Sequence, residues 1–382
     1  MARAYLDHAS TTPPRPDALA ALTQWTSLVP GDPGRVHEEG RTVRGVLEGA
    51  RDEVAGLLNV ASRQVVFTSG ATEAINAAVW GATRAAPDGP VLCAAVEHSA
   101  VRDASARSAP TEELPVDGTG RIDVDALRAR LGAPGAPRPA LVHCQWANHE
   151  VGTLQPVGEV VALCREAGVA VHVDAAAACG HVPTDLGALD ADLVSVSAHK
   201  LGGIPGAGAL IVRRGRRYPP LLVGGEQERG RRAGLEPLPA LVAFGAVAGL
   251  LAADGGRVVA DEAAVARRHL GSLLDAALAV EGITVVGPAA PEARLPHVAC
   301  LGVHGVEAEP VLIGLDRAGV AVHSGSACSS ESIEPSPVLE AMGADPSHSL
   351  RVSVGWSTTE EDCAAFTGAF PRVVAALRAL RG

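Results

Sequence analysis

The chain has almost no lysine and few aromatic side chains. Lys200 is the one lysine among 32 lysines and arginines, and Phe, Trp and Tyr together make up 3% of the 382 residues. Arginine serves surface charge as well as lysine does, but its pKa above about 12 prevents it from losing a proton and attacking a carbonyl. The single lysine therefore suggests amine chemistry at position 200, with chance under a codon bias as the alternative.

Positive charge and long apolar runs are also scarce. The formal net charge is −11 at pH 7, which argues against nonspecific binding to nucleic acid or to an anionic membrane, because both need a basic face. The longest apolar run, residues 240–253, is shorter than the roughly 20 residues that span a bilayer. The first seven residues have no apolar segment of the kind found in a secretory signal. We therefore expect a cytoplasmic protein that binds neither nucleic acid nor membrane.

The seven cysteines form no C-x-x-C pair and have no zinc-ligand spacing, so we expect reduced thiols and no resident metal. Most of them lie in apolar segments, but Cys328 lies in the small, polar, serine-rich stretch 323–332. Such a loop exposes a thiol and lets it move, as a nucleophile must; a loop cysteine without a role is the alternative. Arg351 stands alone in an apolar strand, where it would clamp an amino-acid carboxylate unless a buried acidic partner holds it.

Short β-branched segments alternate with amphipathic helical segments through the first two thirds of the chain. The expected strands are residues 65–67, 91–95, 140–144, 169–173, 193–197 and 209–213. The expected helices between them are residues 71–85, 123–131 and 157–167. This alternation predicts an α/β fold with a mostly parallel sheet that is covered on both faces.

The pattern changes near residue 255. A long helix at 257–279, strands near 283–286 and 297–303, a helix at 310–318, a strand at 350–354 and a terminal helix at 360–380 are expected after it. This α+β order predicts a second, smaller domain. We assign residues 14–255 to a large domain, and residues 1–13 with 256–382 to a small domain that carries the cysteine loop.

Lys200 follows the expected strand 193–197 and precedes a glycine-rich loop. Ligands of doubly wound sheets bind at the carboxyl ends of strands, so Lys200 stands where an amine that links a cofactor is expected. Ser197 and His199 carry donors suited to a phosphate on that cofactor. Asp174 ends another strand, where a carboxylate would keep the ring nitrogen of pyridoxal phosphate protonated. A strand-end cap is the alternative for Ser197 and Asp174.

Two further polar segments follow expected strands. Gly70, Ala71 and Thr72 open a helix, whose free N–H groups would cradle a phosphate together with the Thr72 hydroxyl. His98 follows strand 91–95 and is suited to stack on a cofactor ring and to carry protons. In isolation, a structural histidine would be the better interpretation of His98.

The ordered set of motifs resembles the class V, fold type I pyridoxal-phosphate enzymes, and specifically the cysteine desulfurases of the group I, long-loop subfamily. The resemblance is carried by residues 5–13, 66–73, 97–98, 148–152, 172–175, 197–200, 225–229, 324–328 and 334–336. It implies an α/β large domain with a mostly parallel seven-stranded sheet and a smaller α+β domain. It also implies a homodimer with pyridoxal 5'-phosphate near the subunit interface.

The resemblance implies a reaction as well. L-Cysteine binds to the cofactor that Lys200 holds as a Schiff base, Lys200 or His98 removes the α-proton, and the Cys328 thiolate attacks the substrate sulfur. The products are L-alanine and a persulfide on Cys328. Asn148 and Arg351 would hold the substrate carboxylate, with Asn148 also near the cofactor hydroxyl.

An acceptor protein would then take the sulfur from Cys328, which could itself serve only as a transient cluster ligand. Iron–sulfur cluster assembly, tRNA thiolation, DNA phosphorothioation and thio-metabolite synthesis stay open as destinations, and selenocysteine as a second substrate. Two other hypotheses stay open too: another class V lyase or aminotransferase that acts on a small amino acid, and a non-catalytic paralogue that acts as a scaffold.

Four positions depart from the pattern of the cysteine desulfurases. Ala177 replaces a glutamine that donates to the cofactor ring, and Leu235 replaces a threonine that reaches the phosphate across the dimer. Glu226 replaces a glycine, and His149 replaces a second asparagine. A lost donor costs about 1–3 kcal/mol where it leaves a buried group unpaired. We therefore expect weaker cofactor retention or an altered absorbance spectrum, but not loss of function.

Overall fold

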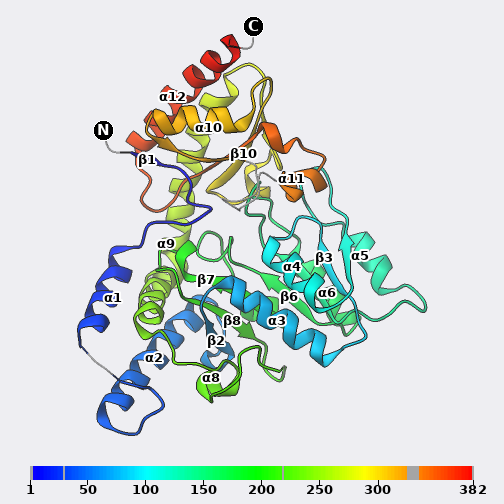
Figure 1. The fold of residues 1–382 in the computed structure, drawn as a ribbon, viewed down its shortest axis with the longest axis vertical. Coiled ribbons are helices and arrows are strands. Elements are labelled where there is room, and N and C mark those ends of the chain that lie inside the picture. Colours follow the sequence, from blue (N-terminus) through cyan, green and yellow to red (C-terminus); the bar gives the residue numbers. More distant parts are fainter. Residues whose placement is uncertain (1–2, 29–30, 217–218, 325–334, 381–382) are drawn as a thin grey trace.

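The computed structural model describes residues 3–28, 31–216, 219–324 and 335–380. Figure 1 shows a large sheet with helices on both of its faces in the lower half, and a smaller body that holds both chain ends in the upper half. The long helix α9 (Leu238–Leu278) runs from one body into the other.

Seven strands form the large sheet, in the order β2-β8-β7-β6-β5-β3-β4. They are β2 (Val65–Thr68), β3 (Val91–Ala94), β4 (Thr111–Leu114), β5 (Leu141–Gln145), β6 (Val171–Asp174), β7 (Leu193–Ser197) and β8 (Gly208–Val212). In this sheet β8 is antiparallel to both of its neighbours, and every other neighbouring pair is parallel. The predicted α/β fold with a mostly parallel seven-stranded sheet is confirmed.

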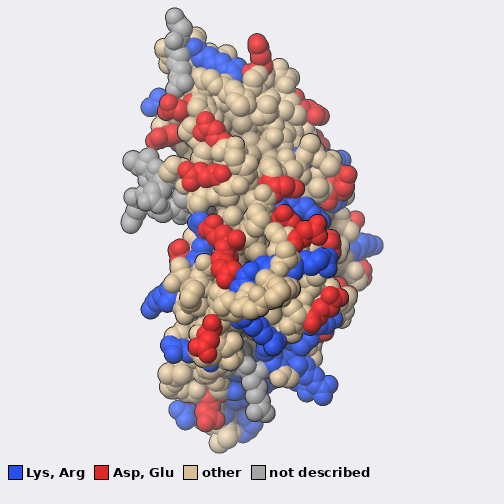
Figure 2. Space-filling view, turned by 90° about the vertical axis from the view of Figure 1, so that its right-hand side faces the viewer, with Lys and Arg blue, Asp and Glu red and all other residues tan. Residues whose placement is uncertain are grey.

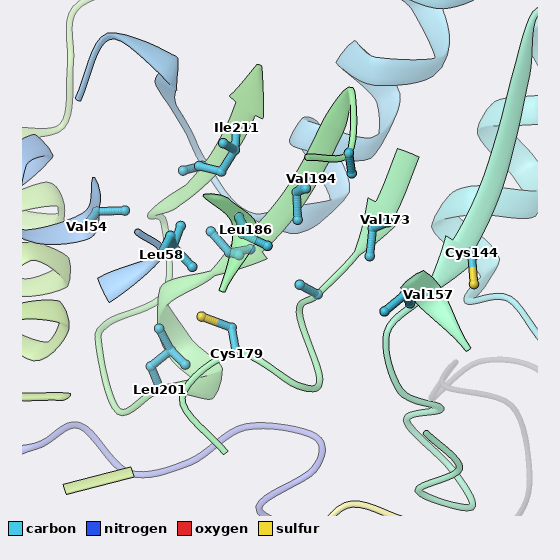
Figure 3. Close-up of a cluster of buried hydrophobic side chains, with 14 of the residues drawn as sticks. Val54, Leu58, Cys144, Val157, Val173, Cys179, Leu186, Val194, Leu201 and Ile211 are labelled. Atoms are coloured by element: carbon cyan, nitrogen blue, oxygen red, sulfur yellow. The ribbon is translucent and has the colours of Figure 1, made fainter. Parts of the chain in front are cut away.

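Helices cover both faces of this sheet because its strands are apolar on both sides. Val65 and Phe67 belong to one buried cluster, and Val66, between them, belongs to another. Figure 3 shows the first cluster, in which side chains of β5, β6, β7 and β8 line up across the sheet. The covering helices are α1 (Pro16–Leu28), α2 (Glu38–Leu57), α3 (Ala71–Ala85), α4 (Ser99–Ser108), α5 (Val124–Leu131), α6 (Val157–Glu166) and the first half of α9.

The smaller body has an antiparallel sheet in the order β12-β13-β10-β9, formed by β12 (His323–Ser324), β13 (Ser349–Ser353), β10 (Val298–Val303) and β9 (Ile283–Val286). Helices α10 (Ala308–Arg317) and α12 (Glu360–Ala379) pack on it. The chain start joins this body, because β1 (Ala4–Tyr5) pairs with β11 (Val320–Ala321). These contacts support our proposal that residues 1–13 and 256–382 form one domain and residues 14–255 the other.

Helix α9 changes direction where the proposed domains meet. Asp254, Gly255 and Gly256 have φ values of 52°, 68° and 82°, in the left-handed region that interrupts a helix. Leu241 and Phe244, before the break, are buried in the large-domain core, and Leu273, after it, is buried in the small-domain core. Among the described residues α9 is the one helix long and apolar enough to cross a membrane. Because residues of α9 are buried in both cores, the helix packs as a core helix of the protein.

A buried pair of histidines crosses the middle of the sheet. His143 on β5 and His172 on β6 are register partners, and their Nδ1 atoms lie 2.9 Å apart, so one ring donates and the other accepts. Neither Nε2 atom has a hydrogen-bond partner among the described residues. Burial lowers the pKa of His172 to about 4, and burial together with His172 lowers the pKa of His143. Both rings are therefore neutral in the folded chain at pH 7.

We expect this pair to make stability depend on pH below 7. The two pKa values are lowered by folding, so the stability is complete above the unfolded value of about 6.5 and is lost as pH falls from there toward about 4. The double variant His143→Leu, His172→Leu should show a flatter loss of unfolding free energy between pH 7 and pH 4.5 in urea titrations. The other histidines are common to both chains, so the difference in slope isolates the pair.

A single variant provides the control for this prediction. His172→Leu leaves the Nδ1 atom of His143 without its partner, and should cost about 1–3 kcal/mol at pH 7. An identical pH slope in the parent chain and the double variant would contradict the prediction.

Candidate active site

A cavity of about 480 Å³ opens at the carboxyl ends of β2, β5, β6 and β7. It collects residues that are far apart in the sequence, and four of them come from the proposed small domain: Ala9, Ser10, His323 and Arg351. Nine of the residues that the sequence predicts for a site line it: Gly70, Ala71, Thr72, His98, Asp174, Ser197, His199, Lys200 and Arg351. The strand-end rule therefore brings the predicted amine, carboxylate and donor groups to one place.

Lys200 ends a short 3-10 helix, η2 (Ala198–Lys200), that follows β7 directly. The turn after it is fixed by Arg15, whose Nε donates to the Leu201 carbonyl at 2.8 Å. The Arg15 guanidinium also pairs with Glu262 on α9 through two contacts of 2.7 Å. Gly202 has a φ of +89°, and a Cβ there would lie 2.6 Å from Arg15. A glycine is therefore needed at position 202. The backbone around Lys200 is held by β7 before it and by Arg15 after it.

Asp174, at the end of β6, is oriented by two donors. Its Oδ1 accepts from the Ala176 N–H at 3.0 Å and from the Ser195 hydroxyl at 2.9 Å. A second carboxyl, Glu97, is fully buried nearby, and its Oε2 has no hydrogen-bond partner among the described residues. Burial, reinforced by the charge of Asp174, raises the pKa of Glu97 to about 8. Glu97 is therefore mostly neutral at pH 7. Among the described residues, the carboxyl groups that line the cavity are those of Asp174 and of Glu73, which is paired with Arg232 at 2.9 Å.

The start of α3 contributes backbone donors to the cavity. The turn before it approaches β8 closely, because a Cβ at Gly208 would lie 2.6 Å from the Cα of Gly70. Ser197 and His199 line the same part of the site. Burial, with the Lys200 charge nearby, lowers the pKa of His199 to about 4, so its ring is a neutral donor or acceptor. Helix N–H groups, a hydroxyl and a neutral imidazole form a donor set suited to an anion.

A buried ion pair braces the strand that leads into this turn. Strand β2 lies at the edge of the sheet, and Glu228 covers its free side by accepting from the Phe67 N–H at 2.9 Å. Glu228 also accepts two hydrogen bonds from Arg51, at 2.6 and 2.7 Å. Arg51 in turn donates to the Val65 carbonyl. Glu228 and Arg229 have positive φ values of 49° and 60°, a conformation that non-glycine residues seldom adopt.

His98 caps the first turn of α4. Its Nδ1 accepts from the Ala100 N–H at 3.0 Å, so the neutral ring carries its hydrogen on Nε2. Burial and the charge of Lys200 lower the pKa of His98. The ring of His149 lies against it, with 4.9 Å between ring centroids.

Arg351 has an acidic partner, Asp7, which is the alternative that the sequence analysis gave for this residue. Its Nη2 donates to Asp7 at 2.7 Å, and its Nη1 donates to the His149 carbonyl at 3.0 Å. Its Nε is buried and has no hydrogen-bond partner among the described residues. Its Nη2 also donates to the Ser10 hydroxyl, so within the described part of the chain Nε and one Nη1 hydrogen are the donors left over. The binding of a substrate carboxylate by Arg351 stays a prediction.

Asn148 lies behind the cavity rather than on its lining. It is fully buried, and its Oδ1 accepts from the N–H groups of Glu150 and Val151 while its Nδ2 donates to the Val96 carbonyl. These bonds hold the turn after β5, and the next residue, His149, lines the cavity instead. The role of Asn148 in binding substrate or cofactor stays a prediction. His149, Gln145 and Ser10 are lining residues that the sequence analysis did not assign to the site.

The remaining predicted positions fall in different places. Ala177 lines the cavity, whereas Leu235 is 63% exposed and does not line it. Glu226 caps the short helix α8 (Gln227–Gly230). Cys328 lies outside the described residues.

Comparisons with known proteins agree over nearly the whole chain. Residues 4–366 match the family described as aminotransferase class-V. A cysteine desulfurase of Cereibacter sphaeroides is 38% identical, covering 100% of this chain and 98% of its own, and cysteine desulfurase IscS 1 of Archaeoglobus fulgidus is 35% identical over 98% of each. The structure of a NifS-like protein from Rickettsia africae has a TM-score of 0.88 at 26% identity, covering 98% of this chain and 99% of that one.

We expect the Arg51–Glu228 pair to be a main support of β2 and the adjoining turn. Glu228→Gln leaves the buried Arg51 with only the partly exposed Glu48, 3.3 Å from its Nε, as a counter-charge, and should lower the free energy of unfolding by about 3 kcal/mol in urea titrations. The double variant Arg51→Met, Glu228→Gln removes both charges, and should lose less than the sum of the two single variants. A loss below about 1 kcal/mol for Glu228→Gln would show that the pair does not support the strand.

Proposed function

Because the chain belongs to the class V aminotransferase family and, within it, to the cysteine desulfurases, we propose that it removes sulfur from L-cysteine to give L-alanine and a Cys328 persulfide. The observation that carries the proposal is the cavity in which the single lysine of the chain meets Asp174, the start of α3 and Arg351. An amine, a carboxylate, an anion cradle and a guanidinium are the groups needed to handle a phosphorylated carbonyl cofactor and an amino acid.

The cavity residues fit pyridoxal 5'-phosphate as the cofactor. The volume of about 480 Å³ lies within the range of roughly 300–1,000 Å³ that is usual for small-molecule sites. The α3 N–H groups, Thr72, Ser197 and His199 supply donors for the phosphate, and Asp174 supplies an acceptor for a protonated ring nitrogen. When bound, pyridoxal phosphate withdraws electrons from the bonds at the α-carbon of an amino acid.

The protein side chains divide the remaining work. The Lys200 amine would hold the cofactor, and it is the group that would take the α-proton of the substrate. His98 is less suited to that step, because its Nδ1 lone pair accepts from the Ala100 N–H and its Nε2 carries a hydrogen. His98 instead donates a hydrogen bond through Nε2. Arg351 binds the substrate carboxylate through the donors that Asp7 and the His149 carbonyl leave free.

The other thiols support the assignment of Cys328 as the nucleophile. The six cysteines within the described residues are all buried, and none lines the cavity. Burial raises the thiol pKa of all six, to about 12 for Cys93, Cys164, Cys179 and Cys300. The thiolate is the reactive form of cysteine, so these six are poor nucleophiles at neutral pH. By elimination, Cys328 is the cysteine that can receive sulfur.

We propose that the enzyme works as a homodimer in the cytoplasm and passes its sulfur to an acceptor protein. Leu222, Val223 and Leu235 are 41%, 77% and 63% exposed, and Leu222 borders a second hollow beside α3, so apolar surface lies close to the active site. Figure 2 shows acidic and basic side chains interspersed over one face rather than a large basic area. With a net charge of −11, this supports a protein partner rather than nucleic acid or a membrane. The destination of the sulfur and selenocysteine as a substrate stay open.

Two variants test the proposed reaction. Lys200→Ala should lose the absorbance band of lysine-bound cofactor and all alanine formation, because no other lysine is present. Cys328→Ser should keep the band but form no alanine from cysteine when a thiol acceptor is supplied. Cys363→Ser, a change of a buried cysteine outside the cavity, is the matched control and should stay active.

The products separate the competing functions in the same assay. Pyruvate or a keto acid in place of alanine, or unchanged alanine formation by Cys328→Ser, would favour another class V lyase or aminotransferase. If the parent chain has the same absorbance spectrum as Lys200→Ala, with no band of lysine-bound cofactor, the result would favour a non-catalytic scaffold.

A substitution at Ala177 tests whether the cofactor is held weakly. Ala177 lines the cavity, so Ala177→Gln places an additional amide donor there. We expect this variant to release the cofactor several-fold more slowly in dialysis against a carbonyl trap, and to shift the absorbance maximum of the bound form. Ala177→Leu adds similar bulk without a donor and should not slow the release. Equal release rates for all three chains would contradict the expectation.

A further inference from the structure

His149 occupies a position that the reaction outlined above does not use. It follows β5, lines the cavity and contacts the ring of His98, with 4.9 Å between ring centroids. The residue is 8% exposed, and its backbone carbonyl accepts from Arg351. Asn148 fixes the turn that carries it, by accepting from the two backbone N–H groups that follow. The imidazole is thus held at the cavity by its neighbours on both sides.

The two cavity imidazoles differ in what their nitrogens can do. The Nδ1 of His98 accepts from a backbone N–H, so its lone pair is used and the hydrogen stays on Nε2. A neutral ring in that state offers a hydrogen bond, but no free lone pair to take a proton. No backbone group caps His149 in this way within the part of the chain that the structure describes. Of the two rings, His149 is the one with a basic nitrogen to offer.

Glu150 determines which ring nitrogen of His149 carries the hydrogen and which carries the lone pair. Its Oε1 lies 3.5 Å from His149 Nε2, and its Oε2 accepts from the Ser336 hydroxyl at 2.6 Å. Ser336 is itself fixed, because it caps helix α11 (Pro337–Ala341). A carboxylate facing Nε2 favours the hydrogen on that atom and leaves Nδ1 with the lone pair. It also stabilises the imidazolium that forms when Nδ1 takes a proton.

Burial sets the resting charge of the His149 ring. Burial, with His98, Lys200, Arg351 and Arg102 nearby, lowers the pKa of His149 well below its ordinary value. The ring is therefore neutral at pH 7, and one of its two nitrogens carries a lone pair. Burial raises the pKa of Glu150, while the Ser336 hydroxyl and Arg351 oppose that rise.

We propose that His149 and Glu150 form an imidazole–carboxylate dyad that takes and returns a proton during sulfur removal, which makes His149 a further catalytic residue. The proposal rests on the function proposed above. His149 accepts the proton that leaves the Cys328 thiol. The sulfur–sulfur bond then forms as the carbon–sulfur bond of the substrate breaks, and the electron pair goes to the β-carbon. His149 returns its proton to that carbon, which becomes the methyl group of L-alanine.

The step balances without an external oxidant. The two sulfur atoms are oxidised from thiols to a persulfide, and the β-carbon is reduced as its bond to sulfur becomes a bond to hydrogen. The α-proton is handled separately by Lys200. The dyad therefore supplies a second proton carrier, which the reaction needs and which the capped ring of His98 does not provide.

Three variants separate proton transfer from packing. His149→Phe keeps a buried ring and removes both nitrogens, His149→Asn keeps polarity, and Glu150→Gln keeps an acceptor for Ser336 while removing the charge. We expect both His149 variants to lower kcat about 100-fold with little change in KM, and Glu150→Gln to lower it about tenfold. The double variant His149→Phe, Glu150→Gln should be no slower than His149→Phe alone. Glu159→Gln, an exposed charge change remote from the cavity, is the control.

The pH profile and the ring tautomer are two measurements that would not change if His149 had only a packing role. The acid limb of kcat/KM should shift to lower pH in Glu150→Gln, because the imidazolium loses its counter-charge. The groups that face the dyad and are unchanged in this comparison are His98, Lys200, Arg351 and Arg102, with Asp174 and Asp103 facing His98. In ¹⁵N spectra of the purified enzyme, the His149 signal, assigned by its absence in His149→Asn, should show the hydrogen on Nε2, and should show mixed tautomers in Glu150→Gln.

The outcomes are distinct. A parent enzyme that makes alanine, with His149→Phe within about threefold of its kcat, overturns the dyad and leaves the proposed function standing. If His149→Phe fails to fold, an unmoved acid limb and an unchanged tautomer in Glu150→Gln overturn the dyad, whereas a shift in both supports it. A parent enzyme that forms no alanine overturns the proposed function and the dyad together.

Discussion

The site depends on one constraint of the parallel sheet, which is that its apolar strands are covered on both faces. A strand buried in this way offers polar side chains no room except at its ends. Asp174, Ser197 and Lys200 all come at or just after the carboxyl end of a strand, and the first turn of α3 points its N–H groups at the same edge. Core packing therefore concentrates the chemically active residues in one cavity.

Burial then decides the charge of several groups at or beside that edge. The histidines around the cavity are held neutral, with pKa values lowered to about 4 at His8, His181 and His199, and Glu97 is held protonated by a pKa of about 8. The charges that remain are few. Within the described residues, the charged side chains that line the cavity are Lys200, Arg351, Asp174 and Glu73, and Arg351 and Glu73 are each paired with an opposite charge. An anionic ligand there would therefore depend on the donors of Lys200, Ser197 and the start of α3 rather than on an excess of positive charge.

Much of this arrangement could be predicted from the sequence, where local pattern determines structure. Helix Ala71–Ala85 and strand Leu193–Ser197 have the predicted bounds, because Gly70 precedes the helix and the strand is a short run with valine at 194 and 196. The edge strand β4 was missed, since Thr-Glu-Glu-Leu lacks an apolar run. The pairing of Arg351 with Asp7 joins residues 344 positions apart, and no local pattern specifies it. The position of His149 was missed for a related reason, because it depends on how the Asn148 side chain holds the turn after β5.

The lone lysine shows how the two kinds of information combine. Composition indicates that an amine matters, and the strand pattern indicates where it lies, but neither determines what surrounds it. The backbone next to Lys200 is held by Arg15, which pairs with Glu262 on the second half of α9. Arg351 and His323 reach the cavity from the small domain. The two domains must therefore pack correctly before the amine has its partners, so the break in α9 at residues 253–256, which sets their relative direction, contributes to the chemistry from outside the cavity.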